Sequence, residues 1–168
     1  MVLWGDHGWK LGDHSSWCKH TNFECDTRVP LIIFDPREQG GKRTSRLVEL
    51  IDLYPTLCEM TGLSIPRHCQ GRSFKHLLED PLAGHRYEAY SSYPAHKTMG
   101  HSIRFKNYRY TEWRDQQGEV KASVLTDLAD DPGEETNVRD DPGHATALAY
   151  GKERLQVRIN QALSLIHI

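Results

Sequence analysis

The sequence lacks any long hydrophobic run, and no apolar stretch approaches the roughly 20 residues needed to span a bilayer. It also lacks an excess of charge of one sign, because 21 lysines and arginines oppose 23 aspartates and glutamates, for a formal net charge of -2. A balanced charge provides no basic field that would attract nucleic acid or an anionic membrane surface. We therefore expect neither a nucleic acid nor a membrane as a partner.

A signal peptide is also missing, since Met1 is followed at once by an apolar strand and by no charged n-region. Domains rarely begin inside a buried strand, so we expect an N-terminal part of the protein to precede this sequence. Cysteines are few, and their spacing matches no dense disulfide framework. The candidate zinc ligands His14, Cys18, His20 and Cys25 lack the paired spacing of structural zinc sites.

What is present is the composition of a globular domain, with 38% hydrophobic and 26% charged residues, together with ten histidines. Val2 to Trp4 reads as a short strand, and residues 5–24 form a long loop rich in Gly, His, Trp and Asp. Long loops of this composition are usually functional. Residues 29–34 are continuously apolar and β-branched, which predicts a strand buried on both faces of a parallel or mixed sheet.

Apolar residues between positions 47 and 60 follow a helical spacing, and Gly62 provides the expected end. Pro55 either kinks this helix or lies in the first turn of a helix that begins near Asp52, and we favour the second arrangement. A short helix is expected at residues 73–78. Cys58 lies on the apolar stripe and is interpreted as a small core residue.

From residue 87 the pattern changes to alternating, β-forming segments at 87–91, 101–105 and 108–113. Lys106 and Asn107 predict a two-residue turn, so the last two segments form an antiparallel hairpin. Residues 124–128 add a strand, and residues 145–163 form a helix. The predicted fold class is α/β, with a mixed layer over 1–85, an antiparallel sheet with a closing helix over 86–163, and a disordered or artefactual tail at 164–168.

Asp6 and His7 come directly after the first strand and before a glycine, which suits a divalent cation. Alternatively, Asp6 forms a turn and His7 is a hydrogen-bonded loop residue. Lys19 could bind a sulfate or phosphate group as a point charge, or could be a plain surface lysine. His14 and His20 are either proton donors at the same place or ordinary polar residues of the loop.

A nucleophile is harder to find in this sequence. Ser15 and Ser16 lack the G-x-S-x-G context of a nucleophile elbow. Cys18 lies next to a lysine and could be a thiolate with a lowered pKa, but no third, orienting group is evident. No catalytic residue is therefore assigned within the chain.

Several segments in collinear order resemble type I sulfatases, and most of all the iduronate-2-sulfatases and their bacterial relatives. The matching segments are Asp6-His7-Gly8-Trp9-Lys10-Leu11-Gly12, Trp17-Cys18-Lys19, Thr27-Arg28-Val29-Pro30, Asp52-Leu53-Tyr54-Pro55-Thr56, Ala89-Tyr90-Ser91, Gly100-His101-Ser102-Ile103-Arg104 and Asp131-Pro132-Gly133. The resemblance implies the C-terminal part of an alkaline phosphatase-like fold. It also implies a calcium-dependent hydrolase that cleaves the sulfate ester of a sulfated carbohydrate, as in glycosaminoglycan degradation.

By this resemblance, Asp6 and His7 would bind calcium and Lys19 would bind the substrate sulfate. The family's nucleophile, a formylglycine in a C/S-x-P-S/A-R motif, lies upstream of the matched segments and is absent from these 168 residues. The chain alone is therefore expected to be inactive and to need the N-terminal part of the same protein. The family is periplasmic or secreted in bacteria and lysosomal in animals.

Two alternatives remain open at this point. The first is a phosphomonoester or phosphonate-ester hydrolase of the same superfamily, and the second is a non-catalytic fragment in which Asp6 and His7 bind nothing. Tyr93, His101 and Arg104 could face a sugar, although structural roles are favoured for Tyr93 and Arg104.

Overall fold

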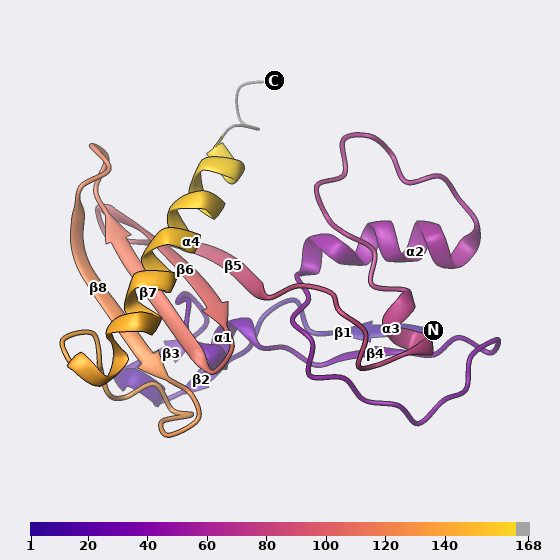
Figure 1. Ribbon diagram of the computed structural model, residues 1–168, viewed down its shortest axis with the longest axis horizontal. Coiled ribbons are helices and arrows are strands. Elements are labelled where there is room, and N and C mark those ends of the chain that lie inside the picture. Colours follow the sequence, from indigo (N-terminus) through magenta and orange to yellow (C-terminus); the bar gives the residue numbers. More distant parts are fainter. Residues whose placement is uncertain (164–168) are drawn as a thin grey trace. The chain divides into compact units, whose positions relative to one another are not determined.

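The computed structural model describes residues 1–163, whose contacts divide them into two compact units (Figure 1). The first unit comprises residues 1–3 and 32–89, and the second combines residues 4–31 with the described residues from 90 onward. This division differs from the expected one after residue 85, because residues 4–31 pack with the C-terminal sheet. Ion pairs from Glu24 to Arg104 and Arg109 are a physical cause of this grouping. The tail expected at 164–168 lies outside the described residues.

The first unit contains most of the two-stranded sheet of β1 (Val2–Trp4) and β4 (Leu31–Ile33), with the helical segments η2 (Leu50–Asp52), α2 (Leu53–Thr61) and α3 (His76–Glu79). Helix α2 confirms the favoured arrangement, since Pro55 lies in its first turn, where a missing N–H costs little. Gly62 ends α2 with a left-handed φ of 74°, a conformation that glycine adopts readily.

The prediction that residues 29–34 are buried on both faces is wrong for this structure. Ile32 and Phe34 are 52% and 55% exposed. In its two-stranded sheet, β4 has one partner strand, so its apolar side chains stay partly open to solvent. A continuous apolar run marks a strand but does not show how many layers cover it.

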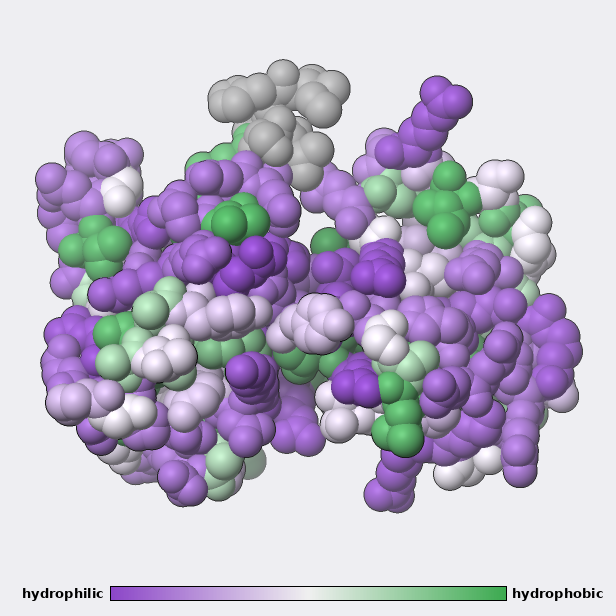
Figure 2. Space-filling model, viewed as in Figure 1, coloured by the Kyte–Doolittle hydropathy of each residue, from purple (hydrophilic) through white to green (hydrophobic). Residues whose placement is uncertain are grey.

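Exposed hydrophobic residues are scattered over the surface. On the face shown in Figure 2, they form separate patches among hydrophilic residues. Single exposed apolar side chains of this kind are normal for a folded domain. Within residues 1–163, no helix combines the length and the apolar character needed to cross a membrane.

Asp52 is the polar centre of the first unit and has no solvent-exposed surface. Its carboxylate accepts hydrogen bonds from the Arg86 side chain, at 2.7 Å from Nε, and from the backbone N–H groups of Arg72 and Glu49, at 2.7 and 2.9 Å. Burial opposes ionisation, but these donors together lower the pKa of Asp52. The buried carboxylate thereby links the start of α2 to two later segments of the unit.

His85 lies beside this centre with a side chain that is fully buried. Its Nε2 is 3.7 Å from Asp52 Oδ2, and its ring packs near the rings of Phe74 and His76. Among the described residues, neither ring nitrogen of His85 has a hydrogen-bond partner. Burial lowers the pKa of His85, so the imidazole is held neutral at pH 7.

The second unit is built on a four-stranded sheet in the order β5-β6-β7-β8, with strands β5 (Glu88–Ala95), β6 (Thr98–Phe105), β7 (Tyr108–Arg114) and β8 (Val120–Asp127). Strands β6 and β7 are antiparallel and pair Phe105 with Tyr108. This register confirms the predicted two-residue turn at Lys106 and Asn107. Strand β8 begins four residues earlier than expected and is antiparallel to β7.

Helix α4 (Ala145–Leu163) has the predicted bounds and follows the short turn η3 (Pro142–His144). In Figure 1 it crosses one face of the sheet, over β6 and β7. Alternate residues of the strands, Ile103, Phe105, Tyr110 and Leu125, point towards the helix and form the core together with Leu155 and Ile159 of α4. Gly151 allows close contact, since a Cβ there would lie 2.9 Å from Tyr110 Cβ.

The opposite face of the sheet is also buried, although its residues are polar: Ser102, Arg109, Thr111 and Thr126. This face packs against the N-terminal part of the second unit. That part contains the small antiparallel pair β2 (Lys10–Leu11) and β3 (Trp17–Cys18), the turn η1 (Asp13–Ser15) and the helix α1 (Glu24–Thr27). Charged and hydroxyl groups therefore hold the long N-terminal loop on the sheet.

Replacement of Leu155 by alanine will destabilise the second unit, because Leu155 is fully buried in the core beneath α4. The expected loss in the free energy of unfolding is about 2–5 kcal/mol. The matched control is Glu153→Ala on the exposed side of the same helix, which should change stability by less than about 0.5 kcal/mol. Urea unfolding followed by tryptophan fluorescence measures both, and equal stabilities would contradict the assigned core.

Mild acid will weaken the first unit through His85. Its pKa is lower in the folded than in the unfolded chain, so the unfolded state binds more protons below about pH 6.5. Stability should be full above that pH and fall towards pH 5, by at most about 1.4 kcal/mol per pH unit for one proton.

Hydrogen exchange of the Phe74 amide, which donates to Thr56 Oγ1 within this unit, reports the opening free energy. His85→Leu should flatten its dependence on pH between 7 and 5. The exposed-histidine control His68→Gln should keep the full dependence. A profile that is flat already in the unaltered chain would refute the role of His85.

Candidate functional site

The three site residues predicted from the sequence lie together in the second unit. Asp6 and His7 follow the end of β1, and Lys19 follows β3. The Nε2 atom of His7 is 3.4 Å from Asp6 Oδ2 and 2.7 Å from Lys19 Nζ. Two segments that are twelve residues apart thus bring an acid, an imidazole and an amine to one place.

The orientation of the His7 ring is fixed by a backbone carbonyl. Its Nδ1 lies 2.8 Å from the oxygen of Gly8, and a carbonyl can only accept, so Nδ1 carries the proton of the neutral ring. The Nε2 atom then has a free lone pair, to which Lys19 donates. This is the tautomer that a metal-binding histidine adopts when its other nitrogen is held by a carbonyl.

Asp6 and His7 fit part of the shell of a divalent cation. Two ligands held about 2.4 Å from a calcium ion at a right angle would be about 3.4 Å apart, which agrees with the observed Asp6–His7 separation. The Asp6 side chain is 81% exposed and His7 is 29% exposed, so an ion could reach both. Within residues 1–163, no group of three or more His, Cys, Asp or Glu side chains converges on one ion, so the pair provides only part of a shell.

Gly8 is the point of closest backbone approach beside the site. A Cβ at this position would lie 1.7 Å from the carbonyl oxygen of Cys25, which no side chain can tolerate. The contact lets the Gly8 amide donate to the Asp26 carbonyl at 2.8 Å. The glycine after the Asp-His pair is therefore required by packing against α1.

Beneath the site lies a buried ion pair that sequence reasoning missed. Lys10 pairs with Asp26, and their side chains are 0% and 4% exposed. Lysine is almost never fully buried without a partner, so its position reflects a strong local requirement. The sixteen-residue separation gives no helical or strand pattern that would reveal the pair in one sequence.

Glu24 is a second residue that the sequence did not mark as special. Its carboxylate accepts from Arg109 Nη2 at 2.6 Å and from Arg104 Nε at 3.1 Å, while its backbone N–H donates to the Glu134 carboxylate. Glu134 also pairs with Arg109 Nε at 2.9 Å. These ion pairs support the structural role favoured for Arg104.

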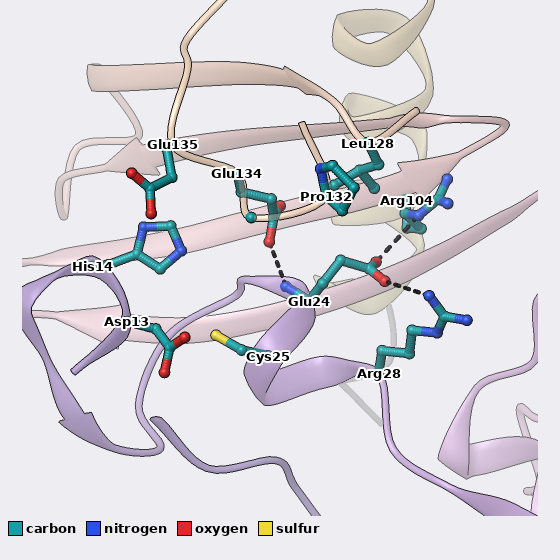
Figure 3. A pocket seen from close by; sticks show the side chains of 11 residues that line it. Asp13, His14, Glu24, Cys25, Arg28, Arg104, Leu128, Pro132, Glu134 and Glu135 are labelled. Carbon is teal, nitrogen blue, oxygen red and sulfur yellow. Dashed lines mark hydrogen bonds and ion pairs between the residues drawn. The ribbon is translucent and has the colours of Figure 1, made fainter. Parts of the chain in front are cut away.

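Glu24, Arg104 and Glu134 line a hollow in the second unit (Figure 3). Burial raises the pKa of Glu134, although Arg109 opposes this effect. Burial also raises the pKa of the Cys25 thiol, so Cys25 is no ready thiolate. His14 lies at one side of the hollow and stacks on Phe23 with ring centroids 3.9 Å apart. The hollow combines both signs of charge and offers no group poised for nucleophilic attack.

Three other candidates from the sequence, His20, Tyr93 and His101, have protein partners. The Tyr93 hydroxyl is hydrogen bonded to His20 Nδ1, and the Tyr90 hydroxyl lies 2.7 Å from His101 Nδ1. Burial lowers the pKa of His101. His20 is exposed and directly follows Lys19 in the chain, whereas Tyr93 and His101 are residues of the sheet, in β5 and β6.

Residues 12–161 match the family described as N-sulphoglucosamine sulphohydrolase, C-terminal. The iduronate 2-sulfatase of Mus musculus is 32% identical over 88% of this chain and 39% of its own length. The chain therefore spans about two fifths of that relative.

Solved structures give a consistent result. A protein in complex with its substrate D-glucosamine-2-N,6-O-disulfate matches 95% of the chain with a TM-score of 0.84 and 25% identity, over 34% of its own length. The phosphonate monoester hydrolase of Silicibacter pomeroyi matches 96% with a TM-score of 0.78 and 28% identity, over 34% of its own length. The fold is the alkaline phosphatase-like fold of the sulfatases, and the chain belongs to the sulfatase family, of which it carries the C-terminal domain.

Proposed function

We propose that this chain forms one wall of a sulfatase active site, with Asp6 and His7 as calcium ligands and Lys19 as the binding residue for the sulfate group. The observation that carries this proposal is the convergence of the three side chains, with Nε2 of His7 3.4 Å from the acid and 2.7 Å from the amine. Membership of the sulfatase family supports the same roles.

The three residues suit the chemistry of a sulfate ester. A bound calcium ion would polarise a sulfate oxygen and oppose its negative charge. Lys19 provides a positive charge with three donors, which can hold a sulfate oxygen while the ester bond breaks. Asp6 and His7 present an oxygen and a nitrogen ligand, and the Gly8 carbonyl keeps the His7 ring in the required orientation.

The substrate we propose is a sulfated sugar of the glycosaminoglycan type. The mouse relative is named an iduronate 2-sulfatase, and one matching structure contains a disulfated glucosamine. Both names describe sulfate groups on sugars, although the sugars differ and the glucosamine carries a second sulfate at position 6. We therefore propose the class of substrate and leave the position of the sulfate open.

The nucleophile would come from outside this chain. A formylglycine needs a C/S-x-P-S/A-R motif, which the 168 residues do not contain. We propose that the 168-residue chain is inactive by itself and needs a segment that carries this motif.

A phosphonate-ester hydrolase is the second candidate function. The phosphonate monoester hydrolase structure resembles the chain nearly as well as the structure with disulfated glucosamine does, with TM-scores of 0.78 and 0.84. A cation and a lysine would bind a phosphonate oxygen as they bind a sulfate oxygen. The two functions differ in the ester that is cleaved, which an assay can separate.

A paramagnetic ion tests the metal ligands in the chain itself. Mn²⁺, which accepts oxygen and imidazole ligands, should broaden the NMR signals of Asp6 and His7. Asp6→Asn and His7→Gln should each weaken Mn²⁺ binding by more than about 10-fold. Asp130→Asn, an exposed acid of the same unit, serves as the control and should change nothing. Equal broadening in all four proteins would refute the metal assignment.

A polypeptide that joins this chain to a segment with the formylglycine motif tests the reaction. We expect it to release sulfate from a sulfated sugar faster than it cleaves a phosphonate monoester. Lys19→Met should lower kcat/KM for the sulfate ester about 100-fold or more, by loss of a charge that opposes the developing negative charge. The unjoined chain is the control and should show no turnover, while faster cleavage of the phosphonate would favour the second candidate.

A further inference from the structure

The buried pair of Lys10 and Asp26 has no place in the proposed chemistry, because solvent reaches neither charged group. Removing two charges from water is costly, and two apolar residues of similar volume would often be as stable or more stable. The pair therefore needs an explanation other than its contribution to stability.

Asp26 contacts both segments that carry the candidate site. Its Oδ2 accepts from Lys10 Nζ and from the backbone N–H of Thr21, at 2.9 Å for the latter. Its backbone carbonyl accepts from the Gly8 amide at 2.8 Å. Lys10 Nζ also reaches Thr21 Oγ1 at 3.4 Å, so both members of the pair meet at Thr21.

Gly8 and Thr21, which Asp26 contacts, each lie within two positions of a site residue in the sequence. Gly8 holds the His7 ring through its carbonyl oxygen, and the Gly8 amide is held by Asp26. Thr21 follows Lys19 by two residues, and its N–H is held by the Asp26 carboxylate. The buried residue Asp26 thus connects the segment that contains His7 with the segment that contains Lys19.

We propose that the Lys10–Asp26 ion pair is a positioning device that sets the distance between His7 and Lys19 and that holds the His7 ring, through Gly8, in the orientation that binds the ion. The part of this inference that concerns ion binding rests on the proposed function. The contacts that join Asp26 to the two segments do not depend on it. Lys10 and Asp26 are positioning residues and not catalytic residues, since neither reaches the site. A carboxylate suits the task because it accepts from Lys10 and Thr21 at once, which an apolar residue cannot do.

The deciding variant is Lys10→Met with Asp26→Leu, which replaces the pair by apolar groups and leaves no unpaired charge. We expect its Tm to stay within a few degrees of that of the unaltered chain, because such replacements are often neutral. The nuclear Overhauser effect between the His7 ring and the Lys19 side chain should disappear, and exchange of the Gly8 amide should become faster. Mn²⁺ binding should weaken about 10-fold or more, as for other residues that orient a ligand.

The matched control is Lys121→Met with Asp115→Leu, which removes an ion pair of 2.8 Å at the surface of the same unit. It should leave the His7–Lys19 signal, the Gly8 exchange rate and Mn²⁺ binding unchanged. If the buried double variant does not fold, Lys10→Met with Asp26→Asn keeps the shape of the Asp26 side chain and leaves no unpaired charge, and the same three measurements on it decide.

The outcomes separate this inference from the proposed function. If the buried variant folds and keeps the His7–Lys19 signal, the Gly8 exchange rate and Mn²⁺ binding, the pair is structural only and the inference is overturned. If the unaltered chain binds no Mn²⁺, the metal assignment fails, while loss of the His7–Lys19 signal in the variant still supports the positioning role.

Discussion

The ion pairs of Glu24 are the interaction on which the second unit depends. Glu24 lies in α1 and accepts from arginines of two adjacent strands, Arg104 of β6 and Arg109 of β7. Arg109 is 4% exposed, so solvent hardly reaches its charge and carboxylates of the protein must neutralise it. Charge-assisted bonds between buried groups are strong, and loss of one partner leaves the other buried and unpaired. This constraint keeps the N-terminal loop on the polar face of the sheet.

The sheet thereby separates two kinds of packing. Its apolar face is closed by α4 through non-directional contacts such as those of Ile103 and Leu155. Its polar face is closed by directed hydrogen bonds, which fix the register of α1 and of the loop before it. Hydrogen bonds of this kind suit a site whose atoms must be placed within tenths of an ångström. Asp6, His7 and Lys19 belong to the loop that lies on this polar face.

Local patterns predicted much of the fold. The spacing of the apolar residues predicted α4, and the turn residues predicted the hairpin at Lys106. Both predictions depend only on residues that are close together in the sequence. The metal and sulfate residues were identified from short motifs by resemblance, and their assignment stays a prediction. The pair of Glu24 and Arg109 was not predictable, since 85 residues separate them and a single sequence carries no record of such a contact. The exposed faces of β4 were missed because apolar composition marks a strand and not its neighbours.

The contact between Lys19 and His7 bears on how such a site would operate. The Nε2 atom of His7 has one lone pair, and Lys19 now donates to it. The same lone pair would be needed to bind a cation, so the ammonium group of Lys19 and a cation exclude each other there. Lys19 would leave Nε2 when a cation binds, and its charge would then be free for an anionic group. On this argument the lysine contact would hold the ring in place for an ion, and cation binding and sulfate binding would be coupled through a single nitrogen atom.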